Sequence, residues 1–103
     1  MKEIVLLCQY GASTGLLTTN MLKEAQKQNI EVNINAYAEY QLDSILKQKD
    51  VDVVLLGPQI RFKKRDFDAK YKDKGIEFLV IDALDYGTMN GKKVLEEALK
   101  HCK

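Results

Sequence analysis

Short apolar runs and helix-like periodic segments alternate four times along the 103-residue chain. The apolar runs cover residues 4–7, 30–36, 51–56 and 76–81. The unbroken runs are typical of strands buried on both faces of a parallel sheet, whereas the run at 30–36 alternates apolar and polar residues as an edge strand does. This alternation predicts an α/β three-layer sandwich, with a four-stranded parallel sheet and helices on both faces. Right-handed crossovers and the edge character of the second strand favour the order 2-1-3-4.

Apolar stripes at helical spacing predict four helices between and after these strands. They cover residues 15–28, 39–47, 61–71 and the segment that follows Asn90 and Gly91. Ser13 and Thr14 suit the N-cap of the first helix. The expected inward side chains of the third helix are Phe62, Phe67 and Tyr71, and residues 82–91 are expected to form a loop. Because the length suits one hydrophobic core, we expect residues 1–103 to form a single domain.

Charge and hydropathy exclude several functional classes. A formal net charge of +1 argues against a nucleic-acid partner. No apolar run approaches the roughly 18 residues of a membrane span. The apolar run that follows the first three residues has only four or five residues, which is too short for a signal peptide. We therefore expect a cytoplasmic protein without direct membrane insertion, monomeric when isolated. Cys8 and Cys102 lack metal-ligand spacing, so neither a metal, another cofactor nor a disulfide is expected.

Cys8 stands at the end of the first predicted strand, directly before a loop of small and polar residues. The loop consists of Gln9, Tyr10, Gly11, Ala12, Ser13, Thr14 and Gly15. Such a loop can turn its backbone N–H groups inward, and the following helix start adds a partial positive charge, so the segment suits a tetrahedral oxyanion. The same field favours a thiolate nucleophile at Cys8. Position alone is equally compatible with a buried structural cysteine.

The loop contains no cation that would clamp a phosphoryl group during hydrolysis. Cysteine phosphatases place an arginine six residues after the cysteine, where this chain has Thr14, and neither Arg nor Lys occurs between Cys8 and Gly15. The loop is thus expected to hold a phosphoryl group and to hydrolyse it slowly, which favours a carrier. A cysteine-phosphatase-like hydrolase and a plain interaction module remain as alternatives. A response-regulator receiver would need carboxylates where Cys8 and Gly57 stand.

Three segments of the chain carry a resemblance to a known family. They are Leu-Leu-Cys-Gln-Tyr-Gly-Ala-Ser-Thr at 6–14, Asp-Val-Val-Leu-Leu-Gly-Pro-Gln-Ile at 52–60, and Ile-Asp at 81–82 followed by Tyr-Gly at 86–87. With them the chain resembles the IIB component of the lactose/cellobiose (chitobiose) class of the bacterial phosphoenolpyruvate-dependent sugar phosphotransferase system. The resemblance implies that a phosphohistidine on the IIA component phosphorylates Cys8. Phosphocysteine would then pass the group to a sugar of the cellobiose, chitobiose or lactose type bound by the membrane IIC permease, with residues 9–15 as the phosphate cradle.

Further polar residues are expected at the rim of this site, because the carboxyl ends of parallel strands share one edge. The candidates are Pro58, Gln59, Arg61, Lys63, Lys64, Asp82 and Tyr86. The basic cluster at 61–65 could meet an acidic partner surface, or it could be an ordinary solvated helix face. Asp82 and Tyr86 could border the site, or they could serve capping and turn formation. Tyr10 is a candidate docking contact on the loop.

Overall fold

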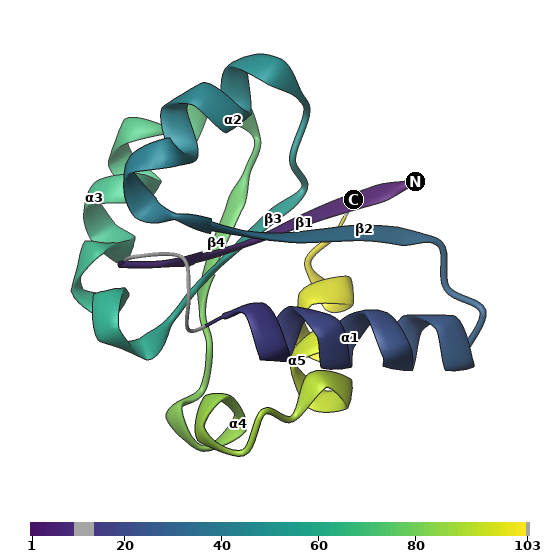
Figure 1. Cartoon of the computed structure of the whole chain (residues 1–103). Coiled ribbons are helices and arrows are strands. Elements are labelled where there is room, and N and C mark those ends of the chain that lie inside the picture. Colours follow the sequence, from purple (N-terminus) through teal and green to yellow (C-terminus); the bar gives the residue numbers. More distant parts are fainter. Residues whose placement is uncertain (10–13, 103) are drawn as a thin grey trace.

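The sheet of the computed structural model, which describes residues 1–9 and 14–102, has four parallel strands in the order β2-β1-β3-β4. These are β1 (Lys2–Cys8), β2 (Val32–Ala38), β3 (Val53–Leu56) and β4 (Glu77–Val80). Figure 1 shows helices on both faces of this sheet, α1 and α5 on one side and α2 and α3 on the other. The predicted α/β class, strand order and edge position of the second strand are confirmed.

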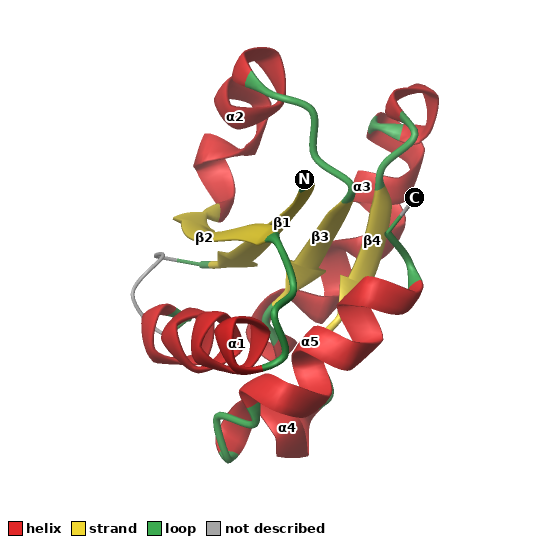
Figure 2. Cartoon of the chain, turned by 90° about the vertical axis from the view of Figure 1, so that its right-hand side faces the viewer, coloured by secondary structure: helices red, strands yellow, loops and turns green. Residues whose placement is uncertain are grey.

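Five helices and three short 3₁₀ turns connect the strands or follow them within the described residues. The helices are α1 (Gly15–Lys27), α2 (Leu42–Gln48), α3 (Lys64–Lys70), α4 (Ala83–Gly87) and α5 (Gly91–Lys100). The 3₁₀ turns are η1 (Glu39–Gln41), η2 (Pro58–Lys63) and η3 (Lys72–Lys74). Figure 2 shows β4 at the edge of the sheet opposite β2, whereas α5 lies beside α1 on one face of the sheet.

The central strand β1 explains why its sequence is apolar without interruption. Ile4 and Leu6 pack into the layer covered by α1 and α5, whereas Val5 and Leu7 pack into the layer covered by α2 and α3. All four side chains are fully buried. Because side chains alternate along a strand, Cys8 points toward the α1 layer, like Ile4 and Leu6.

Strand β2 begins two residues later than the predicted 30–36. The cause is the end of α1, where Asn29 adopts a left-handed conformation with φ of 58°. The backbone N–H of Ile30 then donates to the carbonyl of Ala25 at 2.8 Å and closes the helix. Since that N–H is bonded to the helix, Ile30 does not start the hydrogen-bond ladder between β2 and β1, which begins at Val32.

The predicted helix over 61–71 is wrong in its first part. Ile60 has φ of −116° and ψ of 22°, which breaks the helical path, so Arg61 to Lys63 belong to η2 and α3 begins at Lys64. The kink turns Ile60 into the core and leaves Phe62 71% exposed. Phe62 is therefore not an inward residue, whereas Phe67 and Tyr71 do pack against the core.

The segment 82–91 is not a plain loop, because it contains α4. The Asp82 carboxylate accepts hydrogen bonds from the backbone N–H groups of Leu84 at 3.1 Å and Asp85 at 3.2 Å, and so caps the helix. This helix carries Tyr86 into the core between α1 and α5, where it is buried. The side chain of Tyr86 is thus mostly buried, and its predicted role at the rim of the site stays a prediction.

The Tyr71 hydroxyl is expected to make the stability of the fold decrease at alkaline pH. Burial raises the pKa of Tyr71 above its ordinary 10.0, and its hydrogen bond to the Asp43 carboxylate adds to the effect. A pKa raised by folding means that the stabilisation is complete below pH 10.0 and is lost as the pH rises past that value. We expect Tyr71→Phe to lower the free energy of unfolding by about 1 kcal/mol at neutral pH and to weaken the alkaline decline. Denaturant unfolding at a series of pH values measures both, and an unchanged alkaline slope would contradict the assignment.

Candidate functional site

Three strand ends meet around Cys8 at the carboxyl edge of the sheet. Cys8 is paired with Ala38 of β2, and the backbone N–H of Gly57, directly after β3, donates to the carbonyl of Leu7 at 2.8 Å. A Cβ on Gly57 would lie 3.7 Å from the Cys8 Cβ and 3.0 Å from Oε1 of Gln59. The structure therefore brings Gly57 and the Gln59 amide beside Cys8. A side chain at position 57 would therefore touch Cys8 at ordinary van der Waals distance and press against the end of the Gln59 side chain.

The Cys8 side chain is 2% exposed and receives a hydrogen bond from the start of α1. The fully buried Thr14 donates its hydroxyl to Sγ of Cys8 at 3.9 Å. Thr14 occupies the N-cap position of α1 as predicted, but its side chain makes no capping bond. Its hydroxyl is directed to the sulfur instead. A hydroxyl that donates to sulfur favours negative charge there, and so does the amino terminus of the helix.

Thr14 is fixed in this position by the next turn of α1. Its backbone carbonyl accepts one hydrogen bond from the backbone N–H of Thr18 and one from the Thr18 hydroxyl, both at 2.9 Å. The helix therefore holds the donor group that faces Cys8. The sequence predicted Thr14 as part of the loop that binds phosphate. Its contact with the Cys8 sulfur depends on the packing of α1 against β1, and no sequence pattern indicated it.

Only part of the predicted phosphate cradle falls within the described residues. Tyr10, Gly11, Ala12 and Ser13 lie outside them, so their role as phosphate ligands stays a prediction. Gln9 is exposed directly after Cys8. A Cβ on Gly15 would meet no atom within 4 Å, so space alone does not require glycine where α1 begins.

The second thiol is far from this site and chemically different. Neither Cys8 nor Cys102 forms a disulfide. Burial raises the pKa of the Cys102 thiol, and the Asp52 carboxylate adds to the rise. Cys102 also senses the charge of Lys2, the first residue of β1, so it lies at the amino edge of the sheet, about 20 Å from Cys8 by the rise of a seven-residue strand. Cys102 is therefore a weaker candidate for the nucleophile than Cys8.

The predicted basic cluster is divided into two kinds of cation. Lys63 forms an ion pair with Glu39 at 2.8 Å, and Lys64 forms one with Asp68 at 2.6 Å. Because Glu39 follows β2 and Lys63 follows β3, the first pair links the segments on either side of β1. Arg61 and Arg65 are exposed, and no carboxylate of the described residues lies within ion-pair distance of either. Within this cluster Arg61 and Arg65 are therefore the cations that no carboxylate of the described residues pairs.

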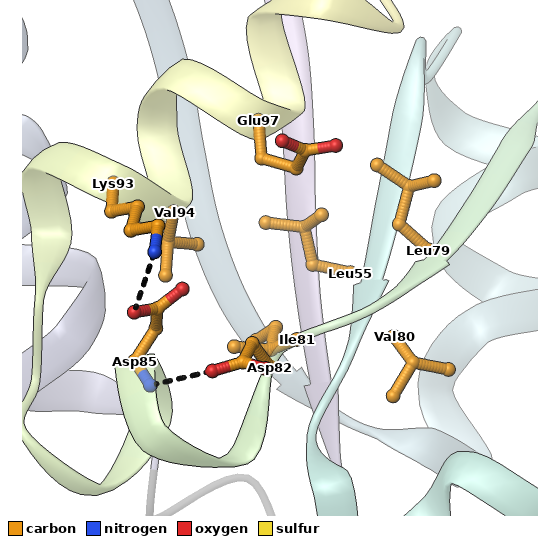
Figure 3. A pocket seen from close by; sticks show the side chains of 9 residues that line it. All are labelled: Leu55, Leu79, Val80, Ile81, Asp82, Asp85, Lys93, Val94 and Glu97. Atoms are coloured by element: carbon orange, nitrogen blue, oxygen red, sulfur yellow. Dashed lines mark hydrogen bonds and ion pairs between the residues drawn. The ribbon is translucent and has the colours of Figure 1, made fainter.

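A cavity of about 310 Å³ lies on the α5 side of β3 and β4 and contains neither Cys8 nor Gly57. Figure 3 shows its lining of Leu55, Leu79, Val80, Ile81, Asp82, Asp85, Lys93, Val94 and Glu97. The buried Asp85 carboxylate faces Lys93 Nζ at 3.9 Å, and Asp82 is occupied as the cap of α4. Asp82 therefore has a structural role here. Within the described residues no group of three His, Cys, Asp or Glu side chains could hold a metal ion, and no helix is long and apolar enough to cross a membrane.

Comparison with known proteins shows the family of this chain. The sequence matches the family described as "PTS system, Lactose/Cellobiose specific IIB subunit" over residues 3–97. The chain belongs to this IIB family. The oligo-beta-mannoside-specific EIIB component of Bacillus subtilis (strain 168) is 37% identical over 99 residues, covering 96% of this chain and 94% of that protein. The resemblance inferred from residues 6–14, 52–60, 81–82 and 86–87 is confirmed.

Two solved IIB structures have the same fold. The lactose-specific IIB domain from Streptococcus pneumoniae superposes with a TM-score of 0.86 at 20% identity, covering 99% of this chain and 98% of that one. The cellobiose-specific IIB component from Borrelia burgdorferi has a TM-score of 0.79 at 42% identity, covering 98% and 91%. This protein is thus a IIB component of a phosphotransferase system (PTS).

The Thr14 hydroxyl is expected to increase the reactivity of Cys8 in this IIB protein. In Thr14→Val the sulfur loses its hydrogen-bond donor, and we expect the thiol to react about tenfold more slowly. This factor corresponds to the lower end of the free energies that hydrogen bonds to charged groups contribute. Thr14→Ser keeps the hydroxyl and is expected to retain most of the rate. Alkylation by iodoacetamide, followed at constant pH, measures the effect without any partner protein. Equal rates for the valine and serine variants would contradict this role.

Proposed function

We propose that this IIB protein carries a phosphoryl group on Cys8, taken from a phosphohistidine of the IIA component and passed to a sugar bound by the membrane IIC permease. The observation that carries the proposal is the contact between the Thr14 hydroxyl and the Cys8 sulfur, at the carboxyl end of the central strand and at the start of α1. Membership of the PTS IIB family supports the same partners. The protein would work at the cytoplasmic side of the permease.

The transfer consists of two in-line displacements at phosphorus. The Cys8 thiolate attacks the phosphohistidine, an S–P bond forms, and the N–P bond breaks with histidine as the leaving group. A sugar hydroxyl then attacks the phosphocysteine: an O–P bond forms, the S–P bond breaks with the thiolate as the leaving group, and the hydroxyl proton is released to solvent. Thr14 and the amino terminus of α1 favour negative charge on the sulfur, so they assist both the attacking thiolate and the departing one.

The protein is a poor candidate for a phosphatase with the same fold. Hydrolysis would need a fixed cation to stabilise the charge on the phosphoryl oxygens. The position of the phosphatase arginine is held by Thr14, whose hydroxyl contacts the sulfur, and neither Arg nor Lys occurs between Cys8 and Gly15. A phosphoryl group on Cys8 should therefore persist until an acceptor arrives.

The sugar that this protein serves belongs to the β-glucoside or disaccharide class in our proposal. Relatives of the chain are named for oligo-β-mannosides, lactose and cellobiose. These names differ although the fold is shared, so the choice of sugar is expected to depend on the permease that binds it.

The proposal is tested by rebuilding the relay with purified parts. The chain is mixed with phosphoenolpyruvate, enzyme I, the phosphocarrier protein and a IIA component of the same class, and its intact mass is followed. We expect the wild-type protein and Cys102→Ser to gain one phosphoryl group, which requires every upstream component. Rapid turnover of p-nitrophenyl phosphate by the isolated chain, with no stable adduct, would favour the hydrolase instead.

A further inference from the structure

The cavity on the α5 side of β3 and β4 is not used by the phosphoryl relay proposed above. It contains about 310 Å³, near the lower end of the volumes of small-molecule sites, and reaches the surface at Val80, which is 37% exposed on the edge strand β4. Leu55 and Ile81, which are almost fully buried, form part of its apolar inner wall. A pocket with apolar walls and a few polar groups is the usual form of a site for a small organic molecule.

One buried carboxylate at this cavity lacks a hydrogen bond. Asp85 is 8% exposed, and no donor among the residues that the structure describes lies within hydrogen-bond distance of its carboxylate oxygens. Its backbone is fixed, because its N–H donates to Asp82 and its carbonyl accepts from the N–H of Asn90. Figure 3 shows the carboxylate directed away from α4 and toward Lys93. A buried carboxylate is costly unless hydrogen bonds replace the water that it loses, so Asp85 favours a donor that enters the cavity.

The cation beside Asp85 is held loosely. Nζ of Lys93 lies 3.9 Å from the Asp85 carboxylate, beyond the range of about 2.7–3.2 Å for an N–H···O hydrogen bond. The Lys93 side chain is 67% exposed. An ion pair with such an exposed partner contributes little free energy. Lys93 can therefore turn into solvent when another cation approaches Asp85.

The charges of the lining indicate the class of ligand. Three carboxylates, those of Asp82, Asp85 and Glu97, line the cavity together with the one ammonium group of Lys93. Asp82 caps α4, and Glu97 lies 3.6 Å from Nζ of Lys100. Asp85 is thus the carboxylate whose hydrogen-bonding capacity is left for a ligand. An anion would be repelled here, and a neutral molecule would leave a buried charge without a close partner.

We infer that this cavity binds a small organic cation, a primary ammonium group attached to a compact apolar body. The ammonium group takes the place of Lys93 and donates to the Asp85 carboxylate, while the apolar body covers Leu79 and Val94 of the wall. The inference does not depend on the proposed function, because Cys8 does not line the cavity and binding needs no phosphoryl group.

The class of ligand is tested by titrating the isotope-labelled full chain with three compounds of similar shape and following the backbone amide signals by NMR. The compounds are cyclohexylmethylammonium, cyclohexylmethanol and cyclohexanecarboxylate. We expect the ammonium compound to bind in the millimolar range and at least about tenfold more tightly than the alcohol, as a hydrogen bond to a charged group implies. The carboxylate compound should bind more weakly still. The amide signals of Val80, Asp85 and Val94 should shift with one dissociation constant.

Three variants separate the contact with Asp85 from a general effect of charge. Asp85→Asn keeps the shape of the side chain and removes its charge, so the affinity for the ammonium compound should fall at least about tenfold. Lys93→Ala removes the competing cation and should raise this affinity several-fold. Lys92→Ala is its matched control, because Lys92 is an exposed lysine of the same helix turn that does not line the cavity. It should change the affinity less than about twofold.

A second pair of variants lies on the exposed side of α5. Glu97 lines the cavity, whereas its exposed neighbour Glu96 does not. Glu97→Gln should weaken binding of the ammonium compound about threefold, within the range of an exposed ion pair, and Glu96→Gln should leave it unchanged. Circular dichroism checks the fold of every variant. If Asp85→Asn does not fold, the pairs at 92–93 and 96–97 still test the inference.

Each outcome of these titrations supports or overturns the inference. Selective binding of the ammonium compound that is lost in Asp85→Asn and strengthened in Lys93→Ala supports it. The inference is overturned if the alcohol binds as tightly as the ammonium compound, or if Lys92→Ala and Lys93→Ala have equal effects, since neither result needs a contact with Asp85. It is also overturned if the ammonium compound at millimolar concentration shifts no signal of the cavity lining.

Discussion

Replacing Cys8 by serine is expected to abolish phosphoryl transfer through this IIB protein. Serine keeps the size of the side chain and can still accept a hydrogen bond from Thr14, but its hydroxyl is a weak nucleophile at neutral pH. Removing a nucleophile from an enzyme that depends on it has cost up to about 10⁶-fold in rate, so we expect a loss of more than about 10³-fold. The initial rate of phosphoryl transfer from the phosphorylated IIA component measures it.

Cys102→Ser is the matched control for this substitution. Cys102 is half-buried at the amino edge of the sheet, and its raised pKa keeps the thiol protonated at neutral pH. Its replacement should leave the transfer rate within twofold of the wild type. Transfer that survives in Cys8→Ser and disappears in Cys102→Ser would reverse the assignment of the nucleophile.

Gly91→Ala is expected to destabilise the whole protein, because α5 begins against the backbone of α1. A Cβ at position 91 would lie 2.5 Å from the carbonyl carbon of Asn20 and 2.6 Å from the backbone nitrogen of Met21. Backbone atoms cannot turn away as a flexible side chain can, so the two helices must separate. We expect the free energy of unfolding to fall by about 1–3 kcal/mol, the usual range for an overpacked core, measured by denaturant unfolding.

The same substitution should reach the site through α1. This helix presents Thr14 to Cys8, so a displacement at Asn20 is expected to slow phosphorylation as well. Gly87→Ala is the matched control, since a Cβ there would meet nothing within 4 Å. Its free energy of unfolding should stay within about 0.5 kcal/mol of the wild type. A Gly91→Ala protein as stable as Gly87→Ala would contradict the close approach of the start of α5 to the backbone of α1.

The sheet could be predicted because its signals are local. The four-residue run from Ile4 to Leu7 is apolar at every position, which only a central strand buried on both faces requires. The apolar stripe of the first predicted helix, with Leu17 and Met21, matches the side that α1 buries. Once the strand order follows from these patterns, the meeting of Cys8 with Gly57 and Gln59 follows as well, because parallel strands share their carboxyl edge.

The errors arose where a single backbone angle or a distant contact decides the outcome. The left-handed Asn29 delays β2, and the non-helical Ile60 reverses the orientation of Phe62, although both residue types also occur in regular elements. The burial of Tyr86 depends on α4, a short helix inside a segment that the sequence predicted to be a loop.

Charge pairing in the basic cluster shows the same limit. The pair between Lys64 and Asp68 follows from helical spacing, since the residues are four apart. The pair between Lys63 and Glu39 joins segments after two different strands and could not be read from spacing. Without that pair the cluster looked like four available cations, whereas the fold leaves Arg61 and Arg65 available.

The most direct test of the central claim is the location of the phosphoryl group by peptide-level mass spectrometry, after reaction of the wild-type protein with a phosphorylated IIA component. We predict one phosphoryl group on the peptide that contains Cys8. It should be lost to a β-linked disaccharide when permease-containing vesicles are added, and only slowly to water. A phosphoryl group on His101, the one histidine of the chain, or on Cys102 would contradict the account. So would the absence of any adduct while the IIA component is fully phosphorylated.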